Sequence, residues 1–173
     1  LQIEKKQRGE SSKKEAEVLE ELNRLNHLVN SFLDWASVEN NPDSASAIHA
    51  IRLDKAAKQV VDRLEKFEGE RIELLAKGDS VAFTNPIHLD QLLTNLISNA
   101  LKYSPSTEKV WVKVEGNLVS VEDRGQGIPQ SVLEKLGQPF NFQRQEGIKG
   151  SGLGLAWVNT ICKKYGWTLR ITR

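Results

Sequence analysis

Apolar residues recur at helical spacing over several long stretches of the chain. In residues 87–105 they form one broad face of a helix, and amides with a lysine form the opposite face. Residues 14–38 follow the four-and-three rhythm of a helix that packs on another helix. Residues 55–67 and the stretch that ends near Gly166 repeat the helical pattern. Helices are therefore predicted over all of these stretches.

Alternating apolar and polar residues between the helices predict strands. Residues 71–76 and 80–84 predict a hairpin across a Lys-Gly-Asp turn. Residues 109–115 and 118–122 predict another hairpin, which turns at a Gly-Asn pair. Each pair of strands is expected to hydrogen-bond within its own hairpin.

Shorter elements connect and follow these segments. Residues 50–53 predict a short strand, residues 129–136 a short helix, and residues 167–172 a final strand. Residues 137–149 have no clean period and predict a loop. Strands with helices on one face indicate an α/β fold, a two-layer α/β sandwich with a mixed sheet, preceded by the long N-terminal helix.

A change of composition divides the chain in two. Residues 40–46, NNPDSAS, are rich in turn formers and indicate a linker. Residues 1–40 are predicted to form a separate helical region, because the helix at 14–38 needs a partner helix, a second chain or both to bury its apolar stripe. Residues 41–173 are predicted to form the globular domain.

Composition narrows the class of protein. The 173 residues carry a net charge of +1 without a basic stripe, so the electrostatic signature of nucleic-acid binding is missing. Cys162 is the one cysteine and lies in an apolar helical pattern, which predicts a buried structural thiol in a reducing compartment. No apolar run reaches the length of a membrane span. A cytoplasmic location is therefore predicted; Leu1 is not a natural start, so a membrane anchor could lie upstream.

The polar face of the helix at 87–105 is unusual. Gln91, Asn95, Asn99 and Lys102 recur along it at intervals of three and four residues. Asparagine is a mediocre helix former, so a solvated surface would more commonly carry lysine and glutamate. An asparagine oxygen suits Mg²⁺, and a lysine suits phosphate oxygens, so this face indicates a metal–phosphate site. The structural alternative is an amphipathic helix whose exposed face carries amides.

A first glycine-rich segment follows, VSVEDRGQGIP at residues 119–129. The pattern predicts a strand that ends at Asp123, with Gly125 and Gly127 directly after it. Glycines without a Cβ allow the backbone to approach a flat ligand, and the carboxylate can accept a hydrogen bond from it. A tight turn that requires glycine is the structural alternative.

A second glycine-rich segment, KGSGLGLAWV, lies at residues 149–158. Gly150, Gly152 and Gly154 come at the start of an apolar-periodic helix, where bare N–H groups favour anions. Ser151 can cap the helix or donate to a phosphate. The segment is not a P-loop, because no GxxxxGK[ST] is present.

Together these segments resemble a known family. An Asn-x3-Asn-x2-Lys helix, then Asp-x-Gly-x-Gly, then Gly-x-Gly-x-Gly, is similar to the N, G1 and G2 boxes of the GHKL ATPases. The flanking residues resemble the sensor histidine kinases in particular, over roughly residues 14–172. The resemblance implies that residues 41–173 bind ATP and transfer its γ-phosphoryl group to a histidine on a dimerisation helix, for relay to the receiver domain of a response regulator.

The resemblance also implies a role for individual residues. ATP and Mg²⁺ are the expected ligands, with Asn99 as the direct Mg²⁺ ligand and Asp123 as the partner of the adenine amine. Asn95 and Lys102 are the expected catalytic residues, and Tyr103 is placed to stack on the base. The predicted nucleotide-binding set is Asn95, Asn99, Lys102, Tyr103, Asp123, Gly125, Gly127, Ile128, Gly150, Ser151, Gly152, Leu153 and Gly154.

None of the histidines has the context of the family's phosphoacceptor. That histidine is followed by an acidic residue that can orient the imidazole and accept its proton, whereas His27, His49 and His88 are not. The acceptor is therefore expected outside this chain, and the chain alone is expected not to phosphorylate itself. The resemblance also implies that residues 1–40 are part of a helical-hairpin dimerisation region, most of whose phosphoacceptor helix is missing, and a homodimer through the N-terminal helix is expected.

Two other functions stay open at this point. A GHKL ATPase that hydrolyses ATP needs an acidic residue to activate water, and Asn95 stands in that place, which argues against hydrolysis. A nucleotide-sensing module without catalysis would share the same binding residues. The chain also departs from the family where Gly166-Trp167 replaces a Gly-Gly pair, and it stops at Arg173, before the family's terminal strand.

Overall fold

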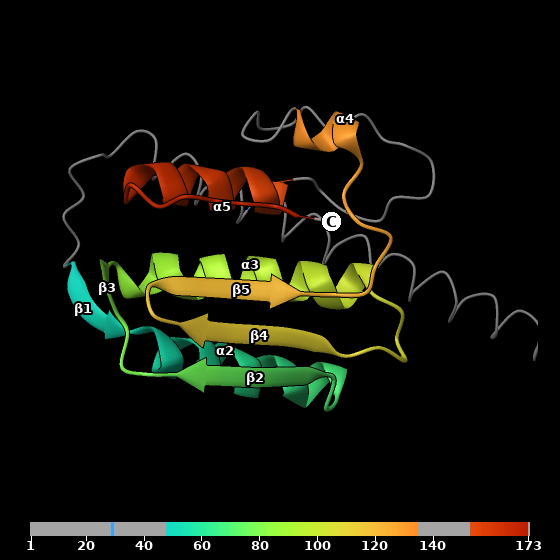
Figure 1. Cartoon of the computed structure of the whole chain (residues 1–173), viewed down its shortest axis with the longest axis horizontal. Coiled ribbons are helices and arrows are strands. Elements are labelled where there is room, and N and C mark those ends of the chain that lie inside the picture. The colour runs from blue at the N-terminus through green and yellow to red at the C-terminus, as the bar shows by residue number, and fades with distance from the viewer. Residues whose placement is uncertain (1–28, 30–47, 135–152, 173) are drawn as a thin grey trace, which may run out of the picture. The chain divides into compact units, whose positions relative to one another are not determined.

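The computed structural model describes residue 29 and residues 48–134 and 153–172 (Figure 1). The chain divides into two compact units, Leu1–Asn40 and Asn41–Arg173, and the strands and helices described here belong to the second. Apart from Val29, which is helical, the predicted helix at 14–38 lies outside the described residues, as do the linker at 40–46 and the loop at 137–149.

A mixed sheet forms one layer of the second unit. Strand β2 (Ile72–Lys77) lies parallel to β4 (Val110–Glu115), and β4 lies antiparallel to β5 (Leu118–Glu122), in the order β2-β4-β5 (Figure 1). The predicted hairpin of β4 and β5 is therefore confirmed. The side chains of β4 that point to the helices are completely buried: Val110, Val112 and Val114.

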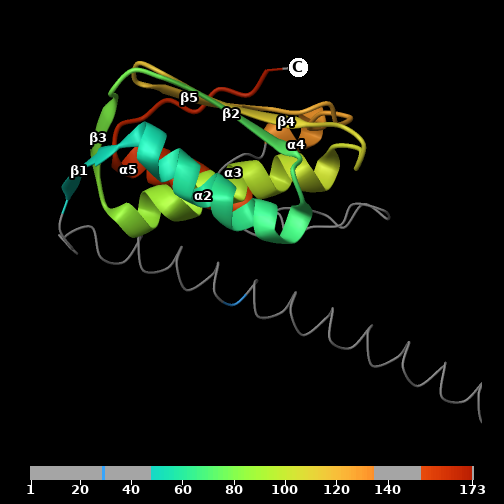
Figure 2. The same ribbon diagram turned by 90° about the horizontal axis from the view of Figure 1, so that it is seen from below.

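Helices form the other layer. Figure 2 shows α2 (Leu53–Glu68), α3 (Pro86–Tyr103) and α5 (Leu153–Lys164) on one side of the sheet. Their apolar side chains fill the space against the strands, and each buried leucine, isoleucine or valine contributes about 1.5–3 kcal/mol. The fully buried helical members of this core are Ala57, Val60, Leu93, Ile97, Val158 and Ile161. The predicted two-layer α/β sandwich is confirmed. Among the helices that the structure describes, none is long and apolar enough to cross a membrane.

Strands β1 (His49–Arg52) and β3 (Val81–Thr84) pair antiparallel in a separate two-stranded sheet. The hairpin predicted between β2 and β3 is therefore wrong, because these two strands belong to different sheets. The Lys-Gly-Asp segment between them does end β2, and Gly78 adopts φ +84° there. A turn sequence fixes where a strand ends, but the partner of each strand is chosen by packing against the helices.

The C-terminal segment also differs from its prediction. After the short helix α4 (Gln130–Leu133) and α5, residues 167–172 form no strand. The N–H of Trp167 instead donates to the carbonyl of Cys162 over 2.7 Å, and its ring stacks on Tyr165 with centroids 5.0 Å apart. Aromatic packing next to a helix end thus replaces the predicted strand. Cys162 is a buried free thiol as predicted, and burial raises its pKa.

Local signals fix both ends of α3. Asn85 is the N-cap: its side-chain oxygen accepts a hydrogen bond from the N–H of Ile87 over 2.8 Å, and Pro86 occupies the first helical position. At the other end, the N–H of Ser104 donates to the carbonyl of Ala100 over 3.0 Å before Pro105 ends the helix. The predicted helix is therefore confirmed, with the polar residues of interest in its second half.

Candidate functional site

The second half of α3 lies against the first turn of α5. Figure 1 shows the two helices running in opposite directions, so that the start of α5 lies beside the middle of α3. A Cβ added at Gly154 would lie 2.7 Å from Oδ1 of Asn95 and 3.6 Å from Nδ2 of Asn99. Only glycine permits this approach without a shift of Asn95. The first and third of the predicted motifs therefore meet in the fold.

Asn95 is held in place on its own helix. Its Nδ2 donates to the carbonyl of Gln91 over 3.0 Å, and this contact directs Oδ1 to Gly154. Asn99 lies one turn further along the same face, half-buried, with its amide nitrogen near Gly154. Both asparagines are thus brought to the start of α5, as the sequence predicted.

The segment after β5 meets the end of α3. Oδ1 of Asp123 accepts a hydrogen bond from the N–H of Gly125 over 2.6 Å, which folds the segment back on itself. A Cβ added at Gly125 would lie 2.6 Å from the carbonyl oxygen of Tyr103 and 2.7 Å from Oδ1 of Asp123. Gly127 adopts φ +76°, which favours glycine, and Ile128 beside it is half-buried. The second motif therefore lies against the last turn of α3.

The last turn of α3 carries a cation and an aromatic ring. Nζ of Lys102 lies 5.5 Å from the ring centroid of Tyr103. The Tyr103 side chain is 39% exposed, and partial burial raises its pKa. The ring can therefore present a neutral apolar face while the lysine supplies a positive charge.

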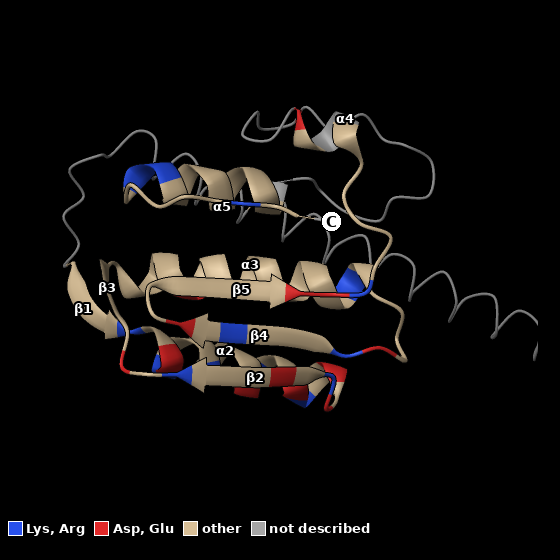
Figure 3. Ribbon diagram, viewed as in Figure 1, with Lys and Arg blue, Asp and Glu red and all other residues tan. Residues whose placement is uncertain are grey.

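The charges near these motifs suit an anion. Helix α5 begins beside Asn99, and the free N–H groups of a first helical turn attract negative charge. Lys102 is the basic residue in the last turn of α3, and α3 has no acidic residue in its first turn. Figure 3 shows that acidic positions gather on α2, on the strands and at the end of β5 rather than along α5. The start of α5 therefore favours the phosphate chain of a ligand, and Asp123 favours a hydrogen-bond donor of the ligand.

Part of the predicted set lies outside the described residues: Gly150, Ser151 and Gly152. Leu153 begins α5. Within residues 48–134 and 153–172, no cluster of three or more His, Cys, Asp or Glu side chains is arranged to hold a metal ion.

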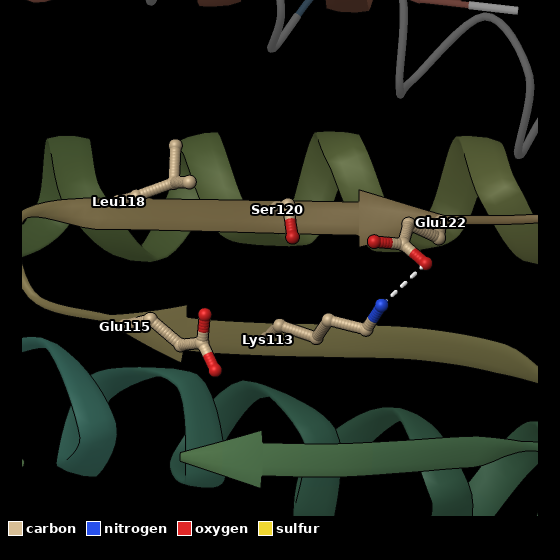
Figure 4. Close-up of a pocket in the computed structure, with 5 residues that line it drawn as sticks. All are labelled: Lys113, Glu115, Leu118, Ser120 and Glu122. Atoms are coloured by element: carbon tan, nitrogen blue, oxygen red, sulfur yellow. Dashed lines mark hydrogen bonds and ion pairs between the residues drawn. The ribbon is translucent and has the colours of Figure 1, made fainter. Parts of the chain in front are cut away.

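A separate hollow lies on the outer face of the sheet. It has a volume of about 210 Å³ and is lined by Lys113, Glu115, Leu118, Ser120 and Glu122 (Figure 4). Nζ of Lys113 and Oε2 of Glu122 form an ion pair of 2.6 Å across it. Figure 4 shows these side chains on β4 and β5, with the helices behind the strands. None of the predicted nucleotide-binding residues lines this hollow.

The opposite end of the α3–α5 pair contains an aromatic cluster that the sequence did not indicate. The hydroxyl of Tyr165 accepts a hydrogen bond from the N–H of Asn85 over 3.2 Å and lies 2.7 Å from Nδ1 of His88. The rings of His88 and Trp157 meet edge to face, with centroids 6.2 Å apart. These partners are up to 80 residues apart in sequence, so no local pattern reveals them.

Comparison with known proteins identifies the family. Residues 84–173, about half of the chain, match the family described as "Histidine kinase-, DNA gyrase B-, and HSP90-like ATPase". The chain belongs to this family. Because its curated relatives are sensor proteins and sensor histidine kinases, it is a GHKL catalytic domain of the sensor histidine kinase type.

Two relatives illustrate the match. The sensor histidine kinase CusS of Escherichia coli strain K12 is 33% identical over 163 residues, covering 89% of this chain and 34% of CusS. The sensor protein QseC of Salmonella typhi is 28% identical over 153 residues, covering 86% of this chain and 34% of QseC. The chain thus spans about a third of the length of these relatives.

Solved structures share the fold. The histidine kinase AdeS of Acinetobacter baumannii has a TM-score of 0.65 and 24% identity, over 86% of this chain and 71% of that one. Full-length ShkA in complex with AMPPNP has a TM-score of 0.62 and 22% identity, over 85% of this chain and 32% of that one. The kinase domain therefore has the α/β fold of histidine kinase catalytic domains.

Proposed function

We propose that the kinase domain binds Mg²⁺–ATP between α3, the segment after β5 and the start of α5. The observation that carries the proposal is the pair of close approaches at Gly125 and Gly154, where a side chain would collide with Tyr103 or Asn95. Three motifs that are far apart in sequence meet there, and each contributes a group that suits one part of ATP. The AMPPNP complex of ShkA, a related fold, supports an adenine nucleotide as the ligand.

The base lies at the Asp123 end in this proposal. Oδ1 of Asp123 is engaged by the N–H of Gly125, so the second carboxylate oxygen would accept a hydrogen bond from the exocyclic amine of adenine. Guanine has a carbonyl at that position and would leave the carboxylate facing another acceptor. The backbone of Tyr103 lies next to Gly125, and its partly exposed ring supplies an apolar surface for the base.

The triphosphate lies at the Asn99 end. Mg²⁺ commonly takes one or two protein oxygens and shares phosphate oxygens and waters for its remaining positions. The side-chain oxygen of Asn99 is such a ligand, and Lys102 and the first turn of α5 offset the negative charge. The donor set therefore fits Mg²⁺ that arrives with the nucleotide.

The reaction is phosphoryl transfer to an imidazole. The bond between the γ-phosphorus and the β–γ bridging oxygen breaks, a phosphorus–nitrogen bond forms, and ADP leaves. The protein contributes position and charge stabilisation. The phosphoryl group then passes to an aspartate of a response regulator receiver domain, and the N-terminal helix dimerises the protein.

The acceptor histidine belongs to another segment. His88 is hydrogen-bonded to Tyr165 at the far end of α3, and His49 is exposed on β1. His27 lies outside the described residues, and Leu28 follows it in the sequence rather than an acidic residue. Transfer is favoured over hydrolysis because Asn95, an amide bound to the carbonyl of Gln91, cannot deprotonate water.

Asn99→Ala tests the metal site. Alanine removes the oxygen and slightly favours the helix, so the melting temperature is expected to stay the same or rise. The Mg²⁺-dependent part of ATP binding is expected to disappear, together with transfer to an added dimerisation segment that carries a histidine followed by an acidic residue. Calorimetry with and without Mg²⁺ and acid-labile labelling from ATP measure the two effects.

Asn117→Ala, in the turn between β4 and β5, is the matched control. It should change neither the Mg²⁺ dependence of ATP binding nor the transfer to the added segment. Unchanged metal dependence in Asn99→Ala would remove that residue from the site. Acid-labile label on the chain alone, without the added segment, would show that the acceptor is present after all.

A further inference from the structure

Arg71 lies directly before β2 and binds the backbone of a distant segment. Its Nη2 donates to the carbonyl of Pro105 over 2.9 Å. Nη1 donates to the carbonyl of Leu101, and Nε and Nη2 donate to that of Glu108, each over 3.4 Å. The side chain is half-buried, and its partners are 30 to 37 residues further along the chain.

These carbonyls belong to the end of α3 and to the loop that follows it. The carbonyls in a last helical turn lack partners within the helix, so an external donor stabilises that turn. A guanidinium group offers several N–H donors in one plane, which allows it to bridge the helix end and the loop at once. Backbone bonds support the arrangement: the N–H of Val110 donates to the carbonyl of Arg71 over 2.8 Å.

The same turn and loop form one wall of the candidate site. Tyr103 lies between Leu101 and Pro105, and its carbonyl lies where a Cβ on Gly125 would collide. The loop also contacts the segment after β5 on its other side, because Nε of Arg124 lies 3.7 Å from Oε2 of Glu108. A shift of the loop would therefore move Tyr103 relative to Asp123 and Gly125.

We propose that Arg71 is a positioning residue for the base end of the nucleotide site. By holding the carbonyls of Leu101, Pro105 and Glu108, it fixes the distance between Tyr103 and the Asp123–Gly125 turn. Arg71 itself does not touch the nucleotide. The proposal rests on the proposed function for its effect on ATP, but the effect on the loop does not depend on any ligand.

Arg71→Lys tests this proposal in the full chain. Lysine keeps the charge but cannot place donors on all of these carbonyls. ATP affinity is expected to fall about tenfold, because hydrogen bonds from a charged donor are lost and the base pocket loosens. Competition by inorganic tripolyphosphate, which lacks a base, is expected to change less than about twofold. Calorimetry measures both.

Arg63→Lys is the matched control. Arg63 also binds α3, through both oxygens of Asp90 and the hydroxyl of Thr94, but away from the loop. Arg63→Lys is expected to alter stability but to change the affinities for ATP and for tripolyphosphate by the same factor. If Arg71→Lys leaves ATP affinity unchanged, or lowers both affinities equally, the positioning role is wrong.

Amide hydrogen exchange without nucleotide separates this proposal from the proposed function. The N–H groups of Ser104 and Glu108 donate to the carbonyls of Ala100 and Pro105. Their exchange is expected to accelerate at least about fivefold in Arg71→Lys but not in Arg63→Lys, because exchange reports local opening. If the parent chain binds no ATP, the proposed function fails, and the exchange result still decides whether Arg71 orders the loop.

Discussion

The two ends of the α3–α5 pair are built in opposite ways. At one end, large rings close the gap between the helices, with Trp157 buried against His88 and Tyr165 bound to the helix cap at Asn85. At the other end, Gly154 brings the bare backbone of α5 against Asn95. The first end stabilises the pair through buried area, whereas the second leaves amides and backbone N–H groups available to a ligand. Changes at the aromatic end should therefore alter stability, and changes at the glycine end should alter nucleotide binding.

Trp157→Ala should have the largest effect. The side chain is 2% exposed, and its removal leaves a cavity between the helices. We expect a loss of about 3–5 kcal/mol in the free energy of unfolding, measured by urea denaturation. Trp157→Phe, which keeps a ring, should lose less and remain foldable. A loss below about 1 kcal/mol in Trp157→Ala would show that this end does not hold the helices together.

Asp123→Asn should have the next largest effect, on binding alone. The asparagine oxygen can still accept the N–H of Gly125, so the turn and the melting temperature should be kept. The charged partner of adenine is lost, and ATP binding should weaken by about 1.5–3 kcal/mol by calorimetry. Glu122→Gln, which breaks the ion pair with Lys113 on the outer face, is the control and should bind ATP normally. Normal ATP affinity in Asp123→Asn would place the base elsewhere.

Gly154→Ala should lower ATP affinity at the glycine end while leaving stability nearly unchanged. The added Cβ must displace Asn95, whose Oδ1 would be 2.7 Å away, but alanine also favours the helix by about 1 kcal/mol. Stability should therefore change little, while ATP affinity falls about fivefold as Asn95 moves. Thermal melting and nucleotide titration of the same sample test this. A large drop in melting temperature with normal binding would reverse the assignment of this end.

Tyr165→Phe should have the smallest effect and only at the aromatic end. The substitution keeps the ring stacked on Trp167 and removes the hydroxyl that contacts Asn85 and His88. We expect a loss of about 1 kcal/mol in stability by urea denaturation, with ATP binding unchanged. A change in ATP affinity would indicate that the two ends of α3 are coupled.

The sequence predicted the local features well. The apolar and polar faces of α3 defined that helix, and the Gly-Asn turn defined the β4–β5 hairpin, because these signals act over a few residues. The spacing of Asn95 and Asn99 on one helix face, with Gly154 at the start of another helix, also indicated residues that the fold brings close together.

The sequence did not predict the long-range features. The turn at Gly78 indicated a β2–β3 hairpin, yet β2 pairs with β4 and β3 with β1. Residues 167–172 alternate like a strand, but Trp167 stacks on Tyr165 instead. Arg71 begins the stretch that predicts a strand at residues 71–76, and nothing local marks its contacts, because its carbonyl partners follow only after α3 has brought the chain back. Each of these depends on tertiary packing that a local pattern does not contain.

The parallel pairing of β2 with β4 has a consequence for how the domain folds. Antiparallel neighbours such as β4 and β5 can form from a short hairpin, whereas a parallel pair needs a crossover connection. Ile72 is opposite Val110, and β3 and α3 occupy the chain between them. Closing this long loop is slow relative to forming the hairpin. The β2–β4 pairing, and with it the complete sheet, is therefore expected to form after the β4–β5 hairpin.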